Sequence, residues 1–202
     1  MTRATPRDGR LSGGKTPASP TPARPSREES RSSAAEVEQR VGAVTDPEIP
    51  TLSIGDLGIV RGVEADESAG AVRVRITPTY SGCPAMEVIA RDIVDAAADA
   101  GWDATVEIVH SPPWTTDWLT ERGRAALAEL DIAPPGPRST GASGPVPVTI
   151  GRAPHTESSV AVVCPRCGST DTELIARFGT TACKALHRCR ACGDPFDEFK
   201  AV

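Results

Sequence analysis

The sequence lacks long apolar runs: nowhere do about 18 or more apolar residues follow one another, the length that a membrane-spanning helix needs. An apolar segment near Met1 is also missing, so we expect neither a secretory signal nor a membrane span. Cysteine is scarce over most of the chain, because only one of the six lies before residue 164. We therefore expect a cytoplasmic protein, in which thiols stay reduced and cysteine pairs usually bind metal or carry out redox chemistry.

Core-forming residues are also in short supply. Apolar residues make up 39% of the 202, while glycine and proline number 18 and 19, which predicts sizeable segments outside packed domains. Positive charge is concentrated in residues 1–27, which carry +5 against −5 for the whole chain. The remaining residues therefore carry −10, and such an acidic body excludes a role that rests on neutralising the phosphates of nucleic acid.

Composition divides the chain into four segments. Residues 1–31 contain no aromatic residue and no hydrophobic period, which predicts a disordered basic arm. Residues 133–159 are rich in proline, glycine and serine, as is typical of a linker. Two folded modules are expected in the remaining ranges, 32–132 and 160–202.

The module at 32–132 begins with a clear helix signal. We expect the helix to start at Ser32 or Ser33, with Glu36 completing a capping box, and to end before the two prolines of DPEIP (46–50). Residues 57–65 and 72–76 then predict two strands joined by the turn DESAG, and the second strand alternates as one buried on a single face does.

A second helix is predicted after Pro84, since apolar residues recur there at helical spacing, and Gly101 should end it. A third strand is expected at Val106 and Ile108, and a last helix from about Thr116 to Leu130. The order α-β-β-α-β-α predicts an α+β fold with a small mixed sheet. The apolar positions of the second helix are Met86, Ile89, Ile93 and Ala97.

The C-terminal module holds the strongest motif. Two C-x-x-C pairs are separated by 21 residues, and a glycine directly follows each pair. Two residues between cysteines allow a tight turn that directs both sulfurs at one ion. About forty residues cannot bury enough apolar surface to fold alone, so a structural zinc ion would supply the missing free energy, on the order of 10 kcal/mol. The predicted ligands are Cys164, Cys167, Cys189 and Cys192.

An all-β zinc ribbon would follow from strands at 160–163, 173–178, 184–188 and 196–200. A rubredoxin-like iron site is the main alternative. A redox-active thiol pair is another, although such pairs occur in βαβ contexts that this module lacks. Four thiolates leave no open coordination position, so we expect a structural ion. Cys183 and His187 could each replace a ligand, but neither fits the C-x-x-C turns, and packing is the simpler role.

Cys83 stands alone, directly before the second predicted helix. As N-cap of that helix it would be stabilised as a thiolate by the helix dipole, and its pKa would fall below the usual value of about 8.5. Such a thiolate could ligate iron, accept a cluster or attack an electrophile. Two other interpretations stay open: an ordinary buried cysteine, and a thiol enzyme with His110, the one histidine in residues 32–132, as its base.

Two further pairs of residues have both a structural and a functional interpretation. Asp46 and Glu48 in DPEIP could bind a metal, but composition favours turn residues. Trp114 and Trp118 stand four residues apart at the start of the last helix, with Thr115 or Thr116 as N-cap. Most such pairs pack in the core, and the alternative is an exposed face for a partner protein.

Taken together, these motifs resemble a known family, the PaaD (also called PaaJ) subunits of the phenylacetyl-coenzyme A epoxidase system. The first module alone is similar to the SufT-like family of iron–sulfur cluster assembly proteins. The resemblance covers about residues 40–135 and 160–200, and it departs at Glu198 and Ala201, where the family has an aromatic residue and a cysteine. The segments that carry it are DPEIPTLSIGDLGIV (46–60), TPTYSGCPAMEVI (77–89), PWTTDWLTERGRAAL (113–127) and FGTTACKALHRCRACGDPF (178–196).

The resemblance implies an accessory or maturation subunit in aerobic phenylacetate breakdown that assists the assembly of iron–sulfur or iron centres. Cys83 would then handle a transient iron ion or cluster, with Asp46 and Glu48 in support. The partners would be the other epoxidase subunits, especially the iron–sulfur reductase, and a homodimer would add ligands, because one thiol is too few.

The resemblance does not imply that this chain itself carries out the oxidation. It has no Glu-x-x-His motif on a long helix, as di-iron centres need, and no glycine-rich dinucleotide loop. The alternative function is a structural scaffold that docks to the oxygenase through Trp114, Trp118 and the ribbon.

Overall fold

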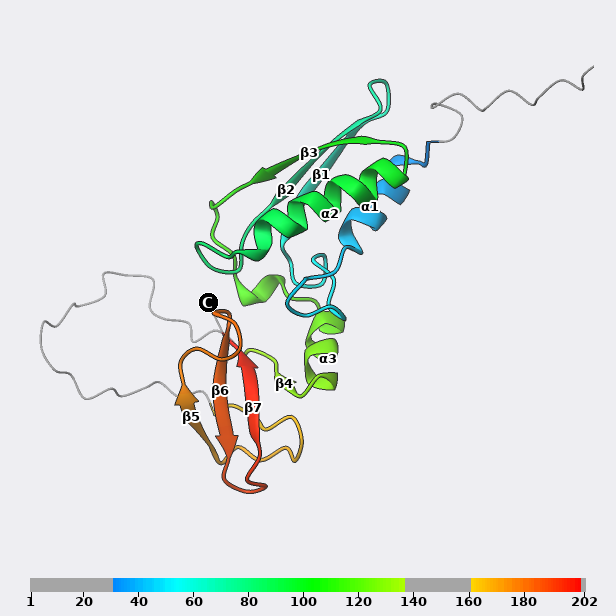
Figure 1. Cartoon of the computed structure of the whole chain (residues 1–202). Helices are drawn as coiled ribbons and strands as arrows, with labels where there is room; N and C mark the ends of the chain where they lie inside the picture. The colour runs from blue at the N-terminus through cyan, green and yellow to red at the C-terminus, as the bar shows by residue number, and fades with distance from the viewer. Residues whose placement is uncertain (1–30, 137–160, 201–202) are drawn as a thin grey trace, which may run out of the picture.

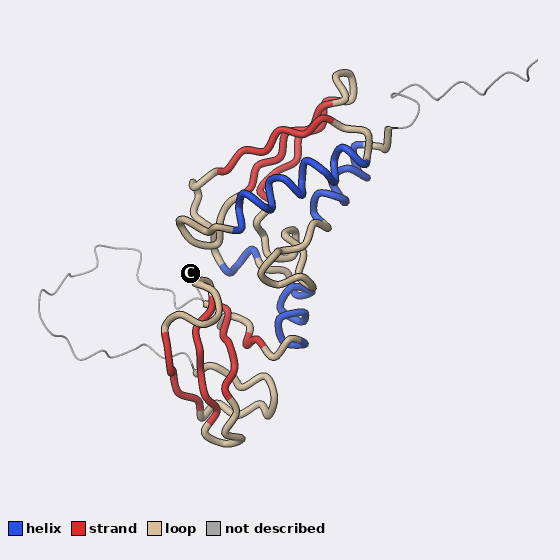
Figure 2. The backbone as a smooth tube through the Cα atoms, viewed as in Figure 1, coloured by secondary structure: helices blue, strands red, loops and turns tan. Residues whose placement is uncertain are grey.

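The computed structural model describes residues 31–136 and 161–200 (Figure 1). The first module packs helices α1 and α2 on one face of a three-stranded sheet, and the second is a four-stranded ribbon (Figure 2). The predicted α+β fold class is confirmed. The elements in chain order are α1 (Ala34–Gly42), β1 (Val60–Asp66), β2 (Ala71–Ile76), α2 (Ala85–Asp99), β3 (Asp103–Ile108), the 3-10 helix η1 (Thr116–Trp118), α3 (Glu121–Glu129), β4 (Ile132–Ala133), β5 (Thr172–Ala176), β6 (Lys184–Cys189) and β7 (Pro195–Phe199).

Helix α1 begins with the predicted capping box. The Ser33 hydroxyl accepts a hydrogen bond from the Glu36 N–H at 3.3 Å, and the Glu36 carboxylate accepts from the Ser33 N–H at 2.8 Å. These bonds satisfy two groups that a helix start otherwise leaves unpaired. Val37 and Val41 then bury the inner face of the helix.

The three-stranded sheet is mixed, as predicted: β1 and β2 are antiparallel, while β2 and β3 are parallel. On β2, Val72, Val74 and Ile76 are buried and alternate with exposed or half-buried residues, so one face of the sheet meets the helices. Helix α2 covers that face with all four of its predicted apolar positions, which are buried. The packing of α2 on the sheet holds the loop before α2, which contains Cys83, at the edge of the hydrophobic core.

The predicted last helix is interrupted, so the prediction of one continuous helix from Thr116 to Leu130 is wrong. Thr115 caps the short helix η1, Leu119 is extended, and Thr120 starts α3 by accepting a hydrogen bond from the Gly123 N–H at 3.0 Å. The break has a physical reason, because threonine is a good N-cap and a second cap favours a second helix start.

The ribbon sheet has the order β4-β7-β6-β5, and its outer strand on one side comes from the first module. Residues 161–163 form no strand, so the prediction of a strand at 160–163 is wrong for the part of it that is described. In its place β4 pairs in parallel with β7 and buries Ile132 and Ala133. Ala133, the expected start of the linker, thus lies in the ribbon sheet. Residues 1–30 of the predicted arm (1–31) and residues 137–159 of the predicted linker (133–159) lie outside the described residues.

The two modules share a hydrophobic core. Phe199 of β7 is 2% exposed and packs within the core of the first module. Its ring meets the edge of Trp114, with ring centroids 5.9 Å apart. Figure 1 accordingly shows one end of the ribbon beside the loops of the first module.

None of the helices in the described ranges combines the length and the apolarity that crossing a membrane requires.

Replacing Gly58 by alanine is expected to lower the free energy of unfolding by roughly 2–4 kcal/mol, because two costs combine. Gly58 has φ +70°, and a Cβ atom there would lie 2.6 Å from the carbonyl oxygen of Trp118. Urea unfolding followed by circular dichroism measures the loss. Gly42→Ala is the matched control, since no atom lies within 4 Å of its added Cβ; unfolding of the two variants at the same urea concentration would contradict the prediction.

Candidate metal centre and thiol site

The two C-x-x-C turns of the ribbon have the same backbone pattern. The N–H of Gly168 donates to the Cys164 carbonyl and the N–H of Gly193 donates to the Cys189 carbonyl, both at 2.9 Å. The two glycines have φ values of +72° and +84°, a conformation that side chains disfavour. A glycine after each pair therefore lets each turn close tightly.

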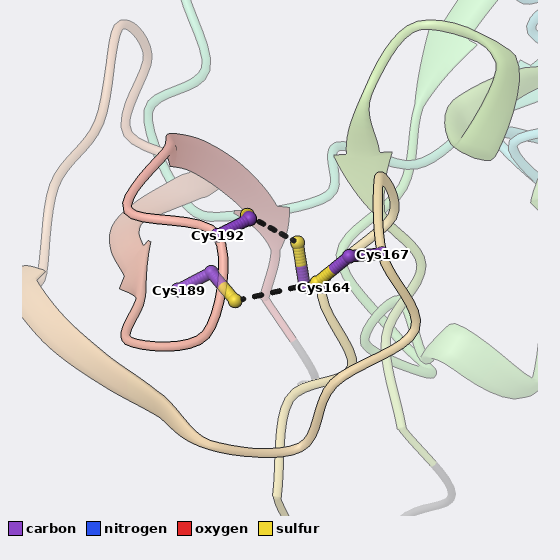
Figure 3. Close-up of side chains that lie close together, drawn as sticks. All are labelled: Cys164, Cys167, Cys189 and Cys192. Atoms are coloured by element: carbon purple, nitrogen blue, oxygen red, sulfur yellow. Dashed lines mark hydrogen bonds between the residues drawn. The ribbon is translucent and has the colours of Figure 1, made fainter.

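The four sulfurs converge on one point (Figure 3). All of them lie within 4.8 Å of one another, and two of the separations are 3.9 Å, between Cys164 and Cys192, and 3.5 Å, between Cys167 and Cys189. A tetrahedral zinc ion with Zn–S bonds of about 2.3 Å needs sulfurs about 3.8 Å apart. The arrangement therefore fits a single four-coordinate ion, with two buried and two exposed ligands.

Backbone N–H groups favour the thiolate form at one of these ligands. The hydrogen bond from the Cys192 N–H lowers the pKa of Cys189 to about 7. Metal binding requires the thiolate, so the lowered pKa reduces the cost of losing the proton at Cys189. At Cys192 the Asp194 N–H lowers the pKa, but burial and the neighbouring sulfurs raise it to about 12. Four sulfurs fill the coordination shell, and the ion would support the fold without an open position for substrate.

His187 does not belong to this cluster. Its Nε2 atom lies 2.8 Å from a Glu198 oxygen, its ring stacks on Phe196 and it is 6% exposed. It is a packing residue, as expected. Cys183 also lies outside the cluster, but its surroundings differ, as described below.

Cys83 precedes helix α2 in a position that differs from the prediction. The N-cap residue is Pro84, so Cys83 lies one residue outside the helix, and the N-cap prediction is wrong. Burial raises the pKa of Cys83, the Ala85 N–H opposes this, and the Glu48 and Asp46 carboxylates raise it further. The predicted lowering of its pKa is therefore wrong as well, because burial and acidic neighbours outweigh the helix terminus. The thiol remains half-buried and is not enclosed in the core.

The two acidic residues of DPEIP have different roles. Asp46 is 7% exposed, and its Oδ1 atom accepts hydrogen bonds from the Glu48 and Ile49 N–H groups at 2.8 and 3.0 Å. Burial raises the pKa of Asp46 even though these bonds lower it. Asp46 thus forms the turn, as composition favoured. The carboxylate of Glu48 instead accepts a hydrogen bond from the Cys183 thiol at 3.7 Å.

Two residues near Cys83 were not among the predicted site residues. Burial and the nearby Cys83 thiol raise the pKa of Tyr80 to about 12, so its phenol stays neutral and can donate a hydrogen bond. Cys183 comes from the ribbon and lines the same pocket as Tyr80. Tyr80 stands three residues before Cys83 in the sequence, and this short spacing could have identified it as a candidate site residue. No sequence pattern links Cys183 to Cys83.

The two tryptophans are arranged differently from each other. Trp114 is 3% exposed, its indole N–H donates to the Leu57 carbonyl at 2.9 Å, and its ring meets Phe199. Its predicted availability to a partner protein is therefore wrong, since the ribbon of its own chain covers it. Trp118 is half-buried, and the central carbon of the Arg61 guanidinium lies 3.4 Å from the centroid of its ring. The contact of Trp118 with a partner protein stays a prediction.

Two protein-family models match the chain. A model described as iron–sulfur cluster assembly protein matches residues 34–109, which include Cys83 and the acidic turn. A model described as PaaD zinc beta ribbon domain matches residues 151–200, which include all four cluster cysteines. The protein is thus of a class that joins an iron–sulfur cluster assembly domain to a zinc ribbon.

One relative covers both modules. An Escherichia coli (strain K12) protein assigned as the D component of 1,2-phenylacetyl-CoA epoxidase is 42% identical over 160 residues, which make up 79% of this chain and 87% of that protein. The chain belongs to the family of these epoxidase D components, whose ribbon is the PaaD type.

Two further relatives match a shorter stretch of the chain. The Fe-S protein maturation auxiliary factors YitW of Bacillus subtilis (strain 168) and SufT of Staphylococcus aureus (strain USA300) are 37% and 36% identical over 86 residues each. Those 86 residues cover 42% of this chain, but 82% of YitW and 96% of SufT. The match therefore spans less than half of this chain and most of each relative.

Proposed function

We propose that this protein is an accessory factor that assists the assembly of iron or iron–sulfur centres in a phenylacetyl-CoA epoxidase system, with Cys83 as the residue that holds the cargo. The observation that carries the proposal is the similarity over both modules to the epoxidase D component, combined with a half-exposed thiol inside the iron–sulfur assembly domain. The names of the two shorter relatives support a maturation role for that domain.

The partners in this proposal are the other epoxidase subunits, above all the iron–sulfur reductase, whose cluster must be built. The ribbon ion is zinc and structural, which the fit of four sulfurs to a tetrahedral site supports. We place the protein in the cytoplasm, where cysteines that form no disulfide, as all six here, stay reduced.

Cys83→Ser tests the proposal directly. We expect the folded variant, co-expressed with the epoxidase subunits, to yield a reductase with severalfold less cluster iron and a correspondingly slower epoxidase, because serine is a poor iron ligand at neutral pH. Iron analysis and the visible absorption of the purified reductase measure the effect.

Ser81→Ala is the matched control, since it removes a nearby exposed hydroxyl and leaves the thiol in place. Unchanged reductase iron and turnover with Cys83→Ser would contradict the maturation role. If the variant also co-purified stably with the oxygenase, that result would favour the structural scaffold instead.

A further inference from the structure

The interface between the two modules contains a pocket of about 100 Å³ that their side chains do not fill. Three aromatic rings line it, those of Tyr80 and Trp114 from the first module and that of Phe199 from the ribbon. A hydroxyl, a thiol and an ammonium group complete the lining, and they belong to Thr79, Cys183 and Lys200. The pocket therefore offers apolar walls and one positive charge to whatever enters it.

The size of the pocket suits a small aliphatic group. An apolar cavity of about 150 Å³ accepts a benzene molecule, so a pocket of about 100 Å³ is too small for an aromatic ring. Its volume is that of about three water molecules at liquid density, which matches a branched aliphatic side chain of about four carbon atoms. Aromatic walls bind such a group through dispersion and through the removal of apolar surface from water.

Apolar surface continues outside the pocket. Phe178 is 68% exposed, the highest value among the large apolar residues that the structure describes. Leu174 and Ile175 of the preceding strand β5 are also exposed. The register of β5 and β6 shifts between Leu174 and Ala176, so Ile175 is an extra residue, and such a bulge redirects a side chain. Exposed apolar residues grouped in this way mark contacts with other proteins.

Lys200 connects Phe178 to the pocket. Its Nζ atom lies 4.4 Å from the centroid of the Phe178 ring and donates to the Arg177 carbonyl at 3.3 Å, and the same residue lines the pocket. Within the ranges that the structure describes, no carboxylate forms an ion pair with this ammonium group. A carboxylate on the partner would complement it, since a hydrogen bond between two charged groups is stronger than one between neutral groups.

One wall of the pocket belongs to the turn that carries Cys83. Tyr80 lines the pocket, and its carbonyl accepts a hydrogen bond from the Cys83 N–H at 3.3 Å. This turn, residues 80–83, leads directly into α2, whose N-cap is Pro84. A protein that occupies the pocket therefore contacts the segment in which the proposed cargo residue lies, which is the position that a transfer of cargo requires.

Resting on the proposed function, we propose that the pocket and the exposed Phe178 beside it form the surface on which the iron–sulfur reductase docks to receive its cluster. The reductase inserts an aliphatic side chain into the pocket, covers Phe178 and Ile175 with apolar surface, and places a carboxylate on Lys200. A small molecule that fills about 100 Å³ would leave Phe178 exposed, so the occupant is a protein. Both modules line the pocket, so the ribbon supplies part of the docking surface as well as a metal site.

The test is isothermal titration calorimetry of the full chain, loaded with zinc, against purified reductase that lacks its cluster. We expect Phe178→Ser, Lys200→Glu and Ala182→Leu each to weaken binding by at least about tenfold, as changes at the centre of an interface do. Ala182 lines the pocket, so leucine there takes up the space that the aliphatic side chain needs. Ile108→Ser is the matched control, because Ile108 is 42% exposed but lies on β3, outside the pocket lining, and this variant should bind normally.

The outcomes separate this inference from the proposed function. If the three variants bind the reductase as the wild type does, or if the wild type does not bind it, the docking surface is overturned; the role of Cys83 still stands if Cys83→Ser lowers the iron content of the co-expressed reductase. If the three variants lose binding but Cys83→Ser leaves that iron content unchanged, the docking surface stands and the maturation role fails.

A second copy of the chain is the other possible occupant of this surface. Sedimentation velocity of the chain alone detects it, and a dimer that Phe178→Ser dissociates would overturn the proposal. Zinc content and circular dichroism are measured for each variant. Should Ala182→Leu not fold, Phe178→Ser decides, because its side chain is 68% exposed, and unchanged affinity in that variant overturns the inference.

Discussion

Removal of the metal ion is expected to unfold the ribbon, residues 161–200, while the first module keeps its helices and mixed sheet. Among the described residues, the hydrophobic cluster beside the metal site comprises Ala133, Cys164, Cys189 and Phe196, and two of these four are ligands. Without the ion, four thiol groups of the cluster would face one another with nothing to hold them. Structural zinc supplies on the order of 10 kcal/mol in comparable small modules, which is more than a core of this size can replace.

Metal analysis should give about one zinc per chain, and a chelator should remove the ion and the amide chemical-shift dispersion of β5, β6 and β7 together. Cys189→Ser should have the same effect without chelator. Cys183→Ser is the matched control, because it changes a cysteine of the same module outside the metal cluster and should retain the zinc. A chelated protein with an unchanged ribbon spectrum would show that the ion is not needed for folding.

Trp114→Ala is expected to lower the free energy of unfolding by about 3–5 kcal/mol, the second largest effect. The ring is buried, its N–H is bonded to the Leu57 carbonyl at 2.9 Å, and its edge meets Phe199 of the ribbon. Alanine would leave a cavity between the modules and an unpaired carbonyl in the core. The loss should also weaken the contact of the ribbon with the first module.

Denaturant unfolding followed by circular dichroism measures the loss, and Trp118→Ala is the matched control. Trp118 is half-buried, and its contact with Arg61 is worth about 1 kcal/mol, so its removal should cost much less. Equal losses for the two variants would contradict the assignment of Trp114 as the contact between modules. A double-mutant cycle of Trp114→Ala and Phe199→Ala should reveal a coupling of about 1 kcal/mol between the rings.

The sequence by itself determined the local features of this protein. The capping box at Ser33, the alternation on β2 and the apolar face of α2 are each encoded within about 15 residues, and the structure has all three. The four-cysteine cluster could also be predicted from the sequence. Each C-x-x-C turn is closed by a hydrogen bond between backbone groups of that turn, and it needs only the glycine that follows the second cysteine. Local interactions are set by neighbours along the chain, so spacing predicts them.

Only the tertiary structure decided the arrangement around Cys83. The expected lowering of its pKa rested on the helix terminus, which is local, but burial and the carboxylates of DPEIP act through space and reverse it. The meeting of Cys183 with Glu48, the strand β4 added to the ribbon and the burial of Trp114 against Phe199 all join segments far apart in sequence. Such contacts follow from the shared core of the two modules. The spacing of residues along the chain does not predict how two modules pack against each other.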